Sequence, residues 1–157
     1  MVAIRRLVDF PIISPAHLGT EERDNINGPS LIKAPDWLPQ ALGKYYLYFA
    51  HHNGQSIRLA YADDLRGPWR VYAPGTLQLA DAPGCAGHIA SPDVHVDHEK
   101  RQIRMYFHGV VRDRPQQRSF VAHSGNGIDF VGKPAAIADF YLRVVKYGSV
   151  WIGMSKG

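Results

Sequence analysis

The sequence predicts an all-β fold of antiparallel sheets that stack as the blades of a β-propeller. Residues 43–52 and 100–109 share one pattern: a polar turn, alternating large side chains, Tyr-Phe, and then histidine. The two segments lie about 60 residues apart, and a repeat of that length with three or four short strands is typical of propeller blades. Blades cannot bury their faces alone, so they must stack on their neighbours.

The first of these segments is expected to form a strand that is buried on both sides. Tyr, Phe and Leu favour strands, and successive side chains alternate between the two faces. Tyr45, Leu47 and Phe49 therefore face one way, while Tyr46 and Tyr48 face the other. Both sets are apolar or aromatic, as expected of a strand with neighbouring layers on either side.

The repetition extends beyond this strand in both directions. The further matching pairs are 28–33 with 91–96, and 57–62 with 119–124. A third copy begins near Tyr141, turns at 147–149 and continues over 150–154. The expected parts are an N-terminal segment at 1–27, a first blade at 28–80, a second blade at 88–131 and the start of a third at 141–157.

Two blades and part of a third are fewer than a closed propeller needs. Propellers close with at least about four blades. We therefore expect the 157 residues to form an incomplete propeller domain and to be the N-terminal part of a longer protein. A two-sheet antiparallel sandwich, complete in itself, is the alternative that the pattern leaves open.

Composition fits a folded domain and argues against several classes of protein. Of the 157 residues, 45% are hydrophobic, which is enough for a buried core. The lone cysteine, Cys85, excludes an intrachain disulfide. The N-terminus shows no signal-peptide pattern, and no apolar run reaches the length of a membrane span. We therefore expect a cytoplasmic protein with no membrane partner.

The net charge of +4 does not indicate a nucleic-acid-binding protein. The 18 Lys and Arg residues are scattered along the chain. Their densest run, residues 112–118, contains a proline and no aromatic residue, and it falls where a turn is expected. A nucleic-acid groove needs clustered basic residues with stacking aromatics, so we expect no nucleic-acid partner.

Asp93 is the sharpest candidate for a functional residue. In a propeller, the first strand of each blade lines the central channel, and Asp93 begins such a strand directly after a proline. A carboxylate near the axis must be paired, hydrogen-bonded or bound to substrate, because burying its charge alone is costly. We nominate Asp93 as a catalytic residue. The alternative is that Asp93 caps a turn or accepts hydrogen bonds from backbone amides.

Polar residues on other elements are expected to converge on the same pocket. Most of them lie at strand starts or strand ends. The expected substrate-binding residues are Asn27, His51, His52, Arg58, His88, His95 and His108. His51 and His52 point to opposite faces if the strand continues, so at most one of them is expected to face a ligand.

No cofactor is expected, but a central metal ion is a hypothesis that the histidines raise. Asp93, His95 and Asp97 share one face by the period of two, with His51 or His108 nearby. Such a set would form a mixed nitrogen and oxygen site. The sequence contains no tight ligand spacing such as His-Glu-x-x-His, so no residue is assigned as a metal ligand.

Several segments share a recognisable pattern, namely 28–32, 43–49, 58–65 with 67–69, and 91–94. They resemble the opening blades of the five-bladed β-propeller glycosidases, which include glycoside hydrolase family 43 and its levansucrase and invertase relatives. The resemblance covers most of residues 25–157 and implies about two and a half blades of a five-bladed ring. It also implies a glycoside hydrolase that cleaves O-glycosidic bonds of a carbohydrate at the propeller axis.

The family pattern places an Asp-Pro at the start of the first blade, where the Asp is the general base. Here Asn27 and Gly28 precede the proline, and asparagine cannot take up a proton as a base. Glycosidic cleavage needs two carboxyl groups about 5 to 10 Å apart. Besides Asp93, we expect the second from further blades or from Asp24. A propeller that binds carbohydrate without cleaving it is the alternative.

The partial third blade predicts an exposed sheet edge. An unpaired strand and an uncovered apolar face are expected around Val144, Val150 and Ile152. Such surfaces promote association between chains. We therefore expect the 157-residue chain to form oligomers or to aggregate.

Overall fold

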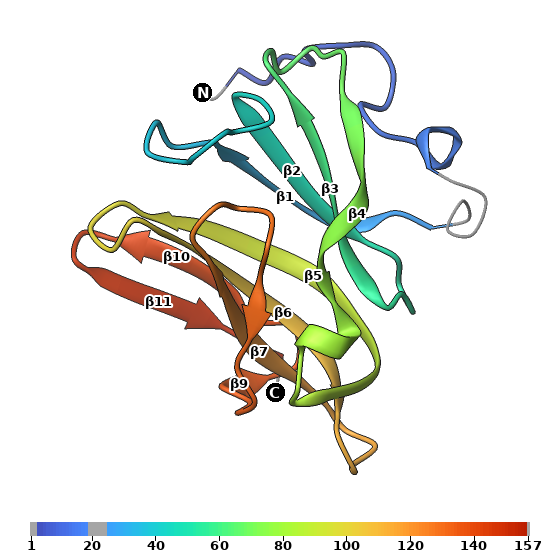
Figure 1. Cartoon of the computed structure of the whole chain (residues 1–157), viewed down its shortest axis with the longest axis vertical. Coiled ribbons are helices and arrows are strands. Elements are labelled where there is room, and N and C mark those ends of the chain that lie inside the picture. The colour runs from blue at the N-terminus through green and yellow to red at the C-terminus, as the bar shows by residue number, and fades with distance from the viewer. Residues whose placement is uncertain (1–2, 19–24, 157) are drawn as a thin grey trace.

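The computed structural model describes residues 3–18 and 25–156, which are almost entirely β-structure (Figure 1). Segments rich in aromatic and β-branched residues form the strands, and glycine, proline and charged residues occupy the turns. The elements are η1 (Pro15–His17), β1 (Asn27–Lys33), β2 (Tyr45–Ala50), β3 (Ser56–Ala62), β4 (Arg70–Gln78), η3 (Leu79–Asp81), β5 (Cys85–Asp97), β6 (Gln102–Val111), β7 (Gln117–Ser124), β8 (Val131–Gly132), β9 (Ala138–Asp139), β10 (Arg143–Tyr147) and β11 (Val150–Met154). The predicted all-β class is confirmed.

The strands form three antiparallel sheets in chain order. β1-β2-β3-β4 make the first sheet, and β5-β6-β7-β8 make the second, with β9 paired to β7. β10 and β11 form a two-stranded third sheet. Along each of these sheets, neighbouring strands follow one another in the chain, as in a propeller blade. Figure 1 shows the first sheet above the second, with β10 and β11 beside the second.

The three sheets repeat one register. The matched pairs of facing residues are Ser30 with Tyr48, Asp93 with Tyr106, and Arg143 with Met154. Two residues before each of these positions, the backbone turns with a positive φ. The values are 57° at Gly28, 52° at Ser91 and 66° at Tyr141. We call these three positions the elbows.

The elbows of the first two sheets touch each other. A Cβ atom on Gly28 would lie 2.6 Å from the Cα of Ser91, closer than such atoms approach in proteins. Glycine is therefore required at position 28 by its positive φ and by this contact. The contact holds the start of β1 beside the middle of β5.

The main core lies between the first and second sheets, and β2 contributes to it strongly. Tyr46 and Tyr48 are fully buried there. The Tyr48 hydroxyl donates a 2.8 Å hydrogen bond to the backbone oxygen of Gly127, which satisfies a polar group inside the core. On the opposite face of β2, Phe49 packs with Leu18 in a second cluster. The predicted burial of both faces of this strand is confirmed.

The second sheet begins earlier than the sequence pattern indicates. β5 starts at Cys85, whereas the blade was expected to start at 88. Its register with β6 shifts between Ala86 and Ile89, so the small residues there form a bulge within the strand. Burial raises the pKa of the Cys85 thiol to about 12, which makes it an inert core residue. Within residues 3–18 and 25–156, no helix is long and apolar enough to cross a membrane.

Candidate functional site

The elbows gather polar and aromatic side chains at one end of the sheets. These side chains come from β1, the turn after β2, β5, β6, β10 and the residues just before β10. We call the group the elbow cluster, and its members are Asn27, His52, His88, His108, Tyr141 and Arg143. Four of the predicted substrate-binding residues therefore lie together.

His108 lies at the centre of the elbow cluster and is only 5% exposed. Its ring centroid lies 4.6 Å from that of Phe140, 5.8 Å from that of Tyr141 and 6.0 Å from that of His88. Burial, assisted by neighbouring basic groups, lowers the pKa of His108 to about 4. The imidazole is therefore neutral at pH 7. Its Nδ1 is buried and has no hydrogen-bond partner among the residues that the structure describes.

Asn27 provides a second buried atom without a partner. Its side-chain nitrogen donates to Oδ1 of Asn25 at 3.1 Å and lies 3.3 Å from Nδ1 of His52. Its Oδ1 is buried and accepts no hydrogen bond from the described part of the chain. A side-chain amide and a neutral imidazole offer both donors and acceptors, which is the mixture that hydroxyl groups require.

Tyr141 and Arg143 close the cluster from the third sheet. Nη1 of Arg143 donates to the backbone oxygens of Ser91 at 3.2 Å and Pro92 at 2.9 Å, and its guanidinium lies over the Tyr141 ring at 4.8 Å. These bonds tie the start of β10 to the elbow of β5. Sequence reasoning missed both residues. The third copy of the repeat begins at Tyr141, and in it Tyr141 and Arg143 occupy the positions that Ser91 and Asp93 occupy in the second copy.

Asp93 lies between the second and third sheets. Its Oδ2 accepts a 2.7 Å hydrogen bond from the backbone nitrogen of Val144 and lies 3.1 Å from Nε2 of His95, which forms an ion pair when protonated. Burial would raise the pKa of Asp93, but the bonds from His95 and Val144 and the charge of Arg143 outweigh it and hold the pKa below its usual value. Asp93 therefore accepts a hydrogen bond from a backbone amide, which is the alternative role that the sequence left open. A catalytic role for Asp93 stays a prediction.

Three of the predicted binding residues lie outside the elbow cluster. Arg58 is buried, donates to the backbone oxygen of Asn25 at 2.7 Å and packs over the Phe49 ring. His51 accepts a hydrogen bond from the backbone nitrogen of Asn53 within the turn after β2. His95 lies beside Asp93 and packs edge-on against Trp151, 5.3 Å away between ring centroids. A substrate-binding role for these three side chains stays a prediction.

A central metal ion stays a hypothesis. Asp93 and His95 are neighbours, but the Asp97 carboxylate lies 3.4 Å from Arg104. No group of three or more His, Cys, Asp or Glu residues within 3–18 and 25–156 is arranged to hold a metal ion. Asp24, the second carboxylate considered from the sequence, lies outside the described residues.

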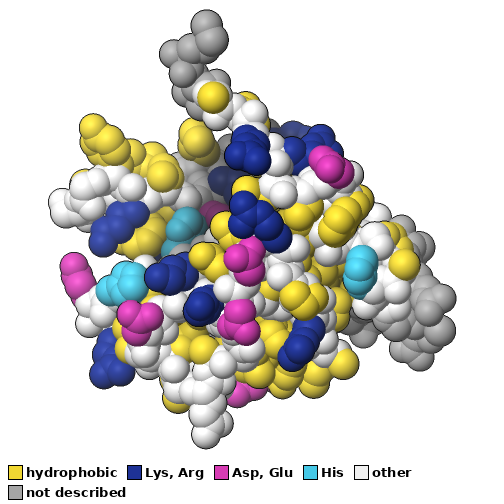
Figure 2. Space-filling view, turned by 90° about the horizontal axis from the view of Figure 1, so that it is seen from above, with side chains coloured by type: hydrophobic (Ala, Val, Ile, Leu, Met, Phe, Trp, Pro, Cys, Tyr) yellow, Lys and Arg dark blue, Asp and Glu magenta, His cyan; other side chains and the backbone are white. Residues whose placement is uncertain are grey.

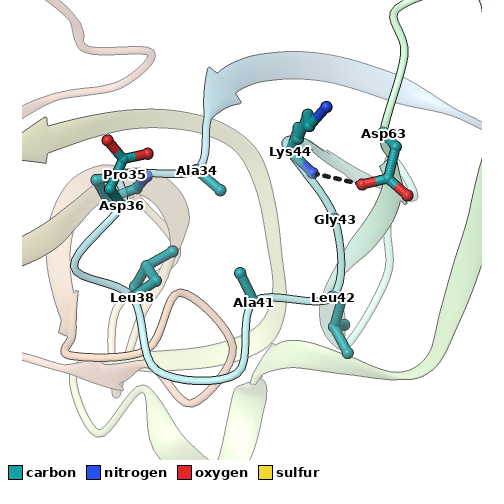
Figure 3. Close-up of a pocket in the computed structure, with 9 residues that line it drawn as sticks. All are labelled: Ala34, Pro35, Asp36, Leu38, Ala41, Leu42, Gly43, Lys44 and Asp63. Atoms are coloured by element: carbon teal, nitrogen blue, oxygen red, sulfur yellow. Dashed lines mark hydrogen bonds between the residues drawn. The ribbon is translucent and has the colours of Figure 1, made fainter.

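A separate pocket lies at the opposite end of the first sheet (Figure 3). Its volume is about 400 Å³, and the loop between β1 and β2 forms most of its wall together with Asp63. The backbone nitrogen of Lys44 donates to Oδ1 of Asp63 at 3.3 Å across this wall. Lys33 pairs with Tyr45 at this end of the sheet and Asn27 with Ala50 at the other, so the pocket is separate from the elbow cluster.

The charged side chains are mixed on the surface. Figure 2 shows Lys and Arg side chains among acidic and hydrophobic ones on the face seen from above the first sheet. Histidine side chains appear at separate places on this face. The expectation that the protein binds no nucleic acid stays a prediction.

Stacked antiparallel meanders of this kind define the blade architecture of β-propellers, and solved structures share it. A GH43 enzyme from Xanthomonas citri complexed with xylose has a TM-score of 0.65 and 17% identity. The match covers 87% of this chain and 38% of the enzyme, and the same enzyme complexed with xylotriose gives the same values. A β-xylosidase has a TM-score of 0.60 and 19% identity over 76% of this chain and 40% of its own. An exo-β-1,3-galactanase from Clostridium thermocellum has a TM-score of 0.50 and 21% identity over 68% of this chain and 23% of its own.

Sequence comparison adds one viral relative. An uncharacterised protein of Acanthamoeba polyphaga mimivirus is 44% identical over 123 residues, which cover 68% of this chain and 35% of the relative. No family model matches the chain. The chain thus spans about a third of the viral relative and about two fifths of the GH43 enzyme and β-xylosidase structures. At these identities the likeness to solved structures shows the fold, which is that of propeller glycosidases.

Proposed function

We propose that this chain recognises a carbohydrate through the elbow cluster. The observation that carries the proposal is that Nδ1 of His108 and Oδ1 of Asn27 are buried and have no hydrogen-bond partner within residues 3–18 and 25–156. A buried polar atom without a hydrogen bond is costly, and a ligand hydroxyl would relieve that cost at each atom. Propeller neighbours in complex with xylose and xylotriose support a sugar as the ligand.

The rest of the cluster fits a neutral sugar. Tyr141 is 41% exposed, so its ring can pack against the apolar face of a sugar ring. His52 is exposed at the rim, where it can reach further hydroxyls. Because His108 is neutral at pH 7, the centre of the cluster offers hydrogen bonds without adding a charge of its own.

Hydrolysis of the glycosidic bond is the second candidate function, and Asp93 is the observation in its favour. Its lowered pKa keeps the carboxylate ionised at neutral pH, as a base or nucleophile must be. Its Oδ2, however, already accepts the Val144 amide, and hydrolysis requires a second carboxyl group. Recognition of a carbohydrate therefore needs only residues that the structure describes. Hydrolysis needs a second carboxyl group in addition to Asp93.

Calorimetric titration with xylotriose tests recognition. We expect saturable binding, which Asn27→Ala and His108→Gln each weaken by about tenfold, the effect of one lost hydrogen bond. His123→Gln, a histidine on β7 outside the cluster, is the matched control and should bind as the unmodified protein does. Equal loss in the control, or no binding heat for the unmodified protein, would contradict the proposal. Release of an aryl xyloside leaving group that Asp93→Asn abolishes would support the hydrolytic candidate instead.

A further inference from the structure

The chain contains three Asn-Gly dipeptides, and the structure holds each of them differently. They lie at 27–28, 53–54 and 126–127. Asparagine before glycine is especially prone to spontaneous deamidation, because no side chain shields the glycine nitrogen and the backbone there turns easily. In this reaction the glycine nitrogen attacks the side-chain carbonyl carbon of the asparagine, so the fold decides whether the two groups can approach each other.

Asn126 is held by hydrogen bonds at both atoms of its side-chain amide. Its Oδ1 accepts from the Ser124 hydroxyl at 2.9 Å and from the backbone nitrogens of Ile128 at 2.9 Å and Asp129 at 2.8 Å. Its Nδ2 donates to Oδ2 of Asp129 at 2.7 Å. The attacking nitrogen, that of Gly127, donates to Oγ of Ser124 at 2.9 Å. Deamidation would disrupt these bonds, so the fold protects this dipeptide.

Asn27 is held by its place between the first two sheets. It pairs with Ala50 of β2, and its Nδ2 donates to Oδ1 of Asn25 at 3.1 Å. The following residue, Gly28, packs so closely on Ser91 that a Cβ would not fit there. The backbone cannot turn at this point without separating β1 from β5, so this dipeptide is also protected.

Asn53 lies in the exposed turn between β2 and β3. Its side chain is exposed and forms no hydrogen bond within residues 3–18 and 25–156. The attacking nitrogen of Gly54 donates to the backbone oxygen of His51 at 3.3 Å, which is longer than the usual range of about 2.7–3.2 Å. The attacking nitrogen is thus weakly held, and the side chain that it attacks is exposed to water.

We propose that Asn53 is a site of spontaneous deamidation. The backbone nitrogen of Gly54 forms a bond to Cγ of Asn53, and the side-chain nitrogen leaves as ammonia with the proton that the glycine nitrogen loses. Water then opens the cyclic imide and leaves either aspartate or isoaspartate. The reaction uses water alone and needs no oxidant, metal or second protein.

The modification changes the turn that contains His52 of the elbow cluster. The backbone nitrogen of His52 donates to Oδ1 of Asn25 at 2.9 Å, and the backbone oxygen of Gly54 accepts from the Ile89 nitrogen at 3.0 Å. These bonds attach the turn on both sides of Asn53. Aspartate adds a negative charge between them, and isoaspartate also lengthens the backbone by a methylene group. The NMR signals of the His52 ring should therefore shift as the protein ages.

Peptide mapping by mass spectrometry tests the proposal on the full chain after incubation at mildly alkaline pH. The mass gain of an amide-to-acid conversion should appear at Asn53 about tenfold faster or more than at Asn27 and Asn126. In urea-denatured protein the three sites should react at similar rates, because each asparagine precedes a glycine. Asn53→Gln should lose the fast conversion, while circular dichroism shows that the variant is folded.

Ser124→Ala provides a second test, because it removes the hydroxyl that holds both Asn126 and the Gly127 nitrogen. Deamidation at Asn126 should become faster in this variant, while the rate at Asn53 stays unchanged. Equal rates at the three sites of the folded protein, or no conversion at Asn53, would overturn the proposal. The same ranking of the sites in the denatured chain would also overturn it, since the fold would then not be the cause. These outcomes do not depend on sugar binding.

Discussion

Ser30 and Asp93 accept equivalent hydrogen bonds in consecutive sheets. Oγ of Ser30 accepts the backbone N–H of Val94 at 2.9 Å, and Oδ2 of Asp93 accepts the backbone N–H of Val144 at 2.7 Å. In each case the acceptor lies two residues after an elbow, and the donor belongs to the first strand of the next sheet. The bond therefore ties consecutive sheets together next to the elbow cluster.

Removing either acceptor should destabilise the fold. Ser30→Ala and Asp93→Ala are each expected to lower the free energy of unfolding by about 1 to 2 kcal/mol, because a buried amide loses its partner. Asp93→Ser, which copies the first sheet, should restore much of the loss. Urea denaturation measures the effect, and Ser149→Ala in the exposed β10–β11 turn is the control. An Asp93→Ala protein as stable as the unmodified one would remove the structural role and favour the catalytic one.

Asp93 should also make stability depend on acid. Its folded-state pKa is below the usual value near 4, so its contribution is fully present above that value and is lost as pH falls through the folded pKa. The unmodified protein should therefore lose more melting temperature than Asp93→Ser when pH is lowered below about 4. Parallel slopes for the two proteins in that range would contradict the assigned bonds.

His108 should act in a higher pH window. Its folded-state pKa of about 4 lies below its unfolded value of 6.5, so protonation favours unfolding. The contribution is complete above pH 6.5 and declines as pH falls towards 4. The shift corresponds to on the order of 3 kcal/mol at most. His108→Gln should make the melting temperature depend less on pH between these limits, while His123→Gln should change this dependence less. An NMR titration midpoint for His108 near 6.5 would contradict its burial.

The elbow at Gly28 can be tested by separating strain from contact. Gly28→Ala adds a Cβ against Ser91 at a φ of 57° and should cost more than about 2 kcal/mol. Gly87→Ala has a φ of 76° with no atom within 4 Å, so it should cost only about 1 kcal/mol. Gly125→Ala, with neither feature, should be nearly neutral. Equal losses in Gly28→Ala and Gly87→Ala would show that the elbows do not touch.

The fold was predictable because one strand pattern occurs twice in the sequence. Alternating aromatic residues in two copies, Tyr48 and Tyr106 among them, indicate the strands, and both stand at the same point of the register. The third copy was harder to place, since it has leucine where the others have proline. A shift of one residue reverses the face of a strand, which is why Val144 was expected where Val145 is exposed.

The candidate site was predictable in part. Asn27, His52, His88 and His108 lie together, although His88 and His108 stand within β5 and β6 and not at the ends of these strands. Arg58 could not be separated from them by sequence, since its contacts, which include the Asn25 backbone oxygen and the Phe49 ring, depend on the folded structure. Asp93 looked catalytic because Ser30 shows that the fold accepts another residue there. The hydrogen bond that unites the two positions involves a backbone amide from the next sheet, which no local pattern reveals.

An NMR titration with xylotriose tests the central claim most directly. Recognition by the elbow cluster predicts saturable shifts of the His108 ring and the Asn27 side-chain amide, with a dissociation constant of about 1 mM or tighter. Signals of the pocket at the other end of the first sheet, such as the Lys44 amide, should stay unchanged. Shifts confined to Lys44 and its neighbours, or none at saturating xylotriose, would contradict carbohydrate recognition at the elbows.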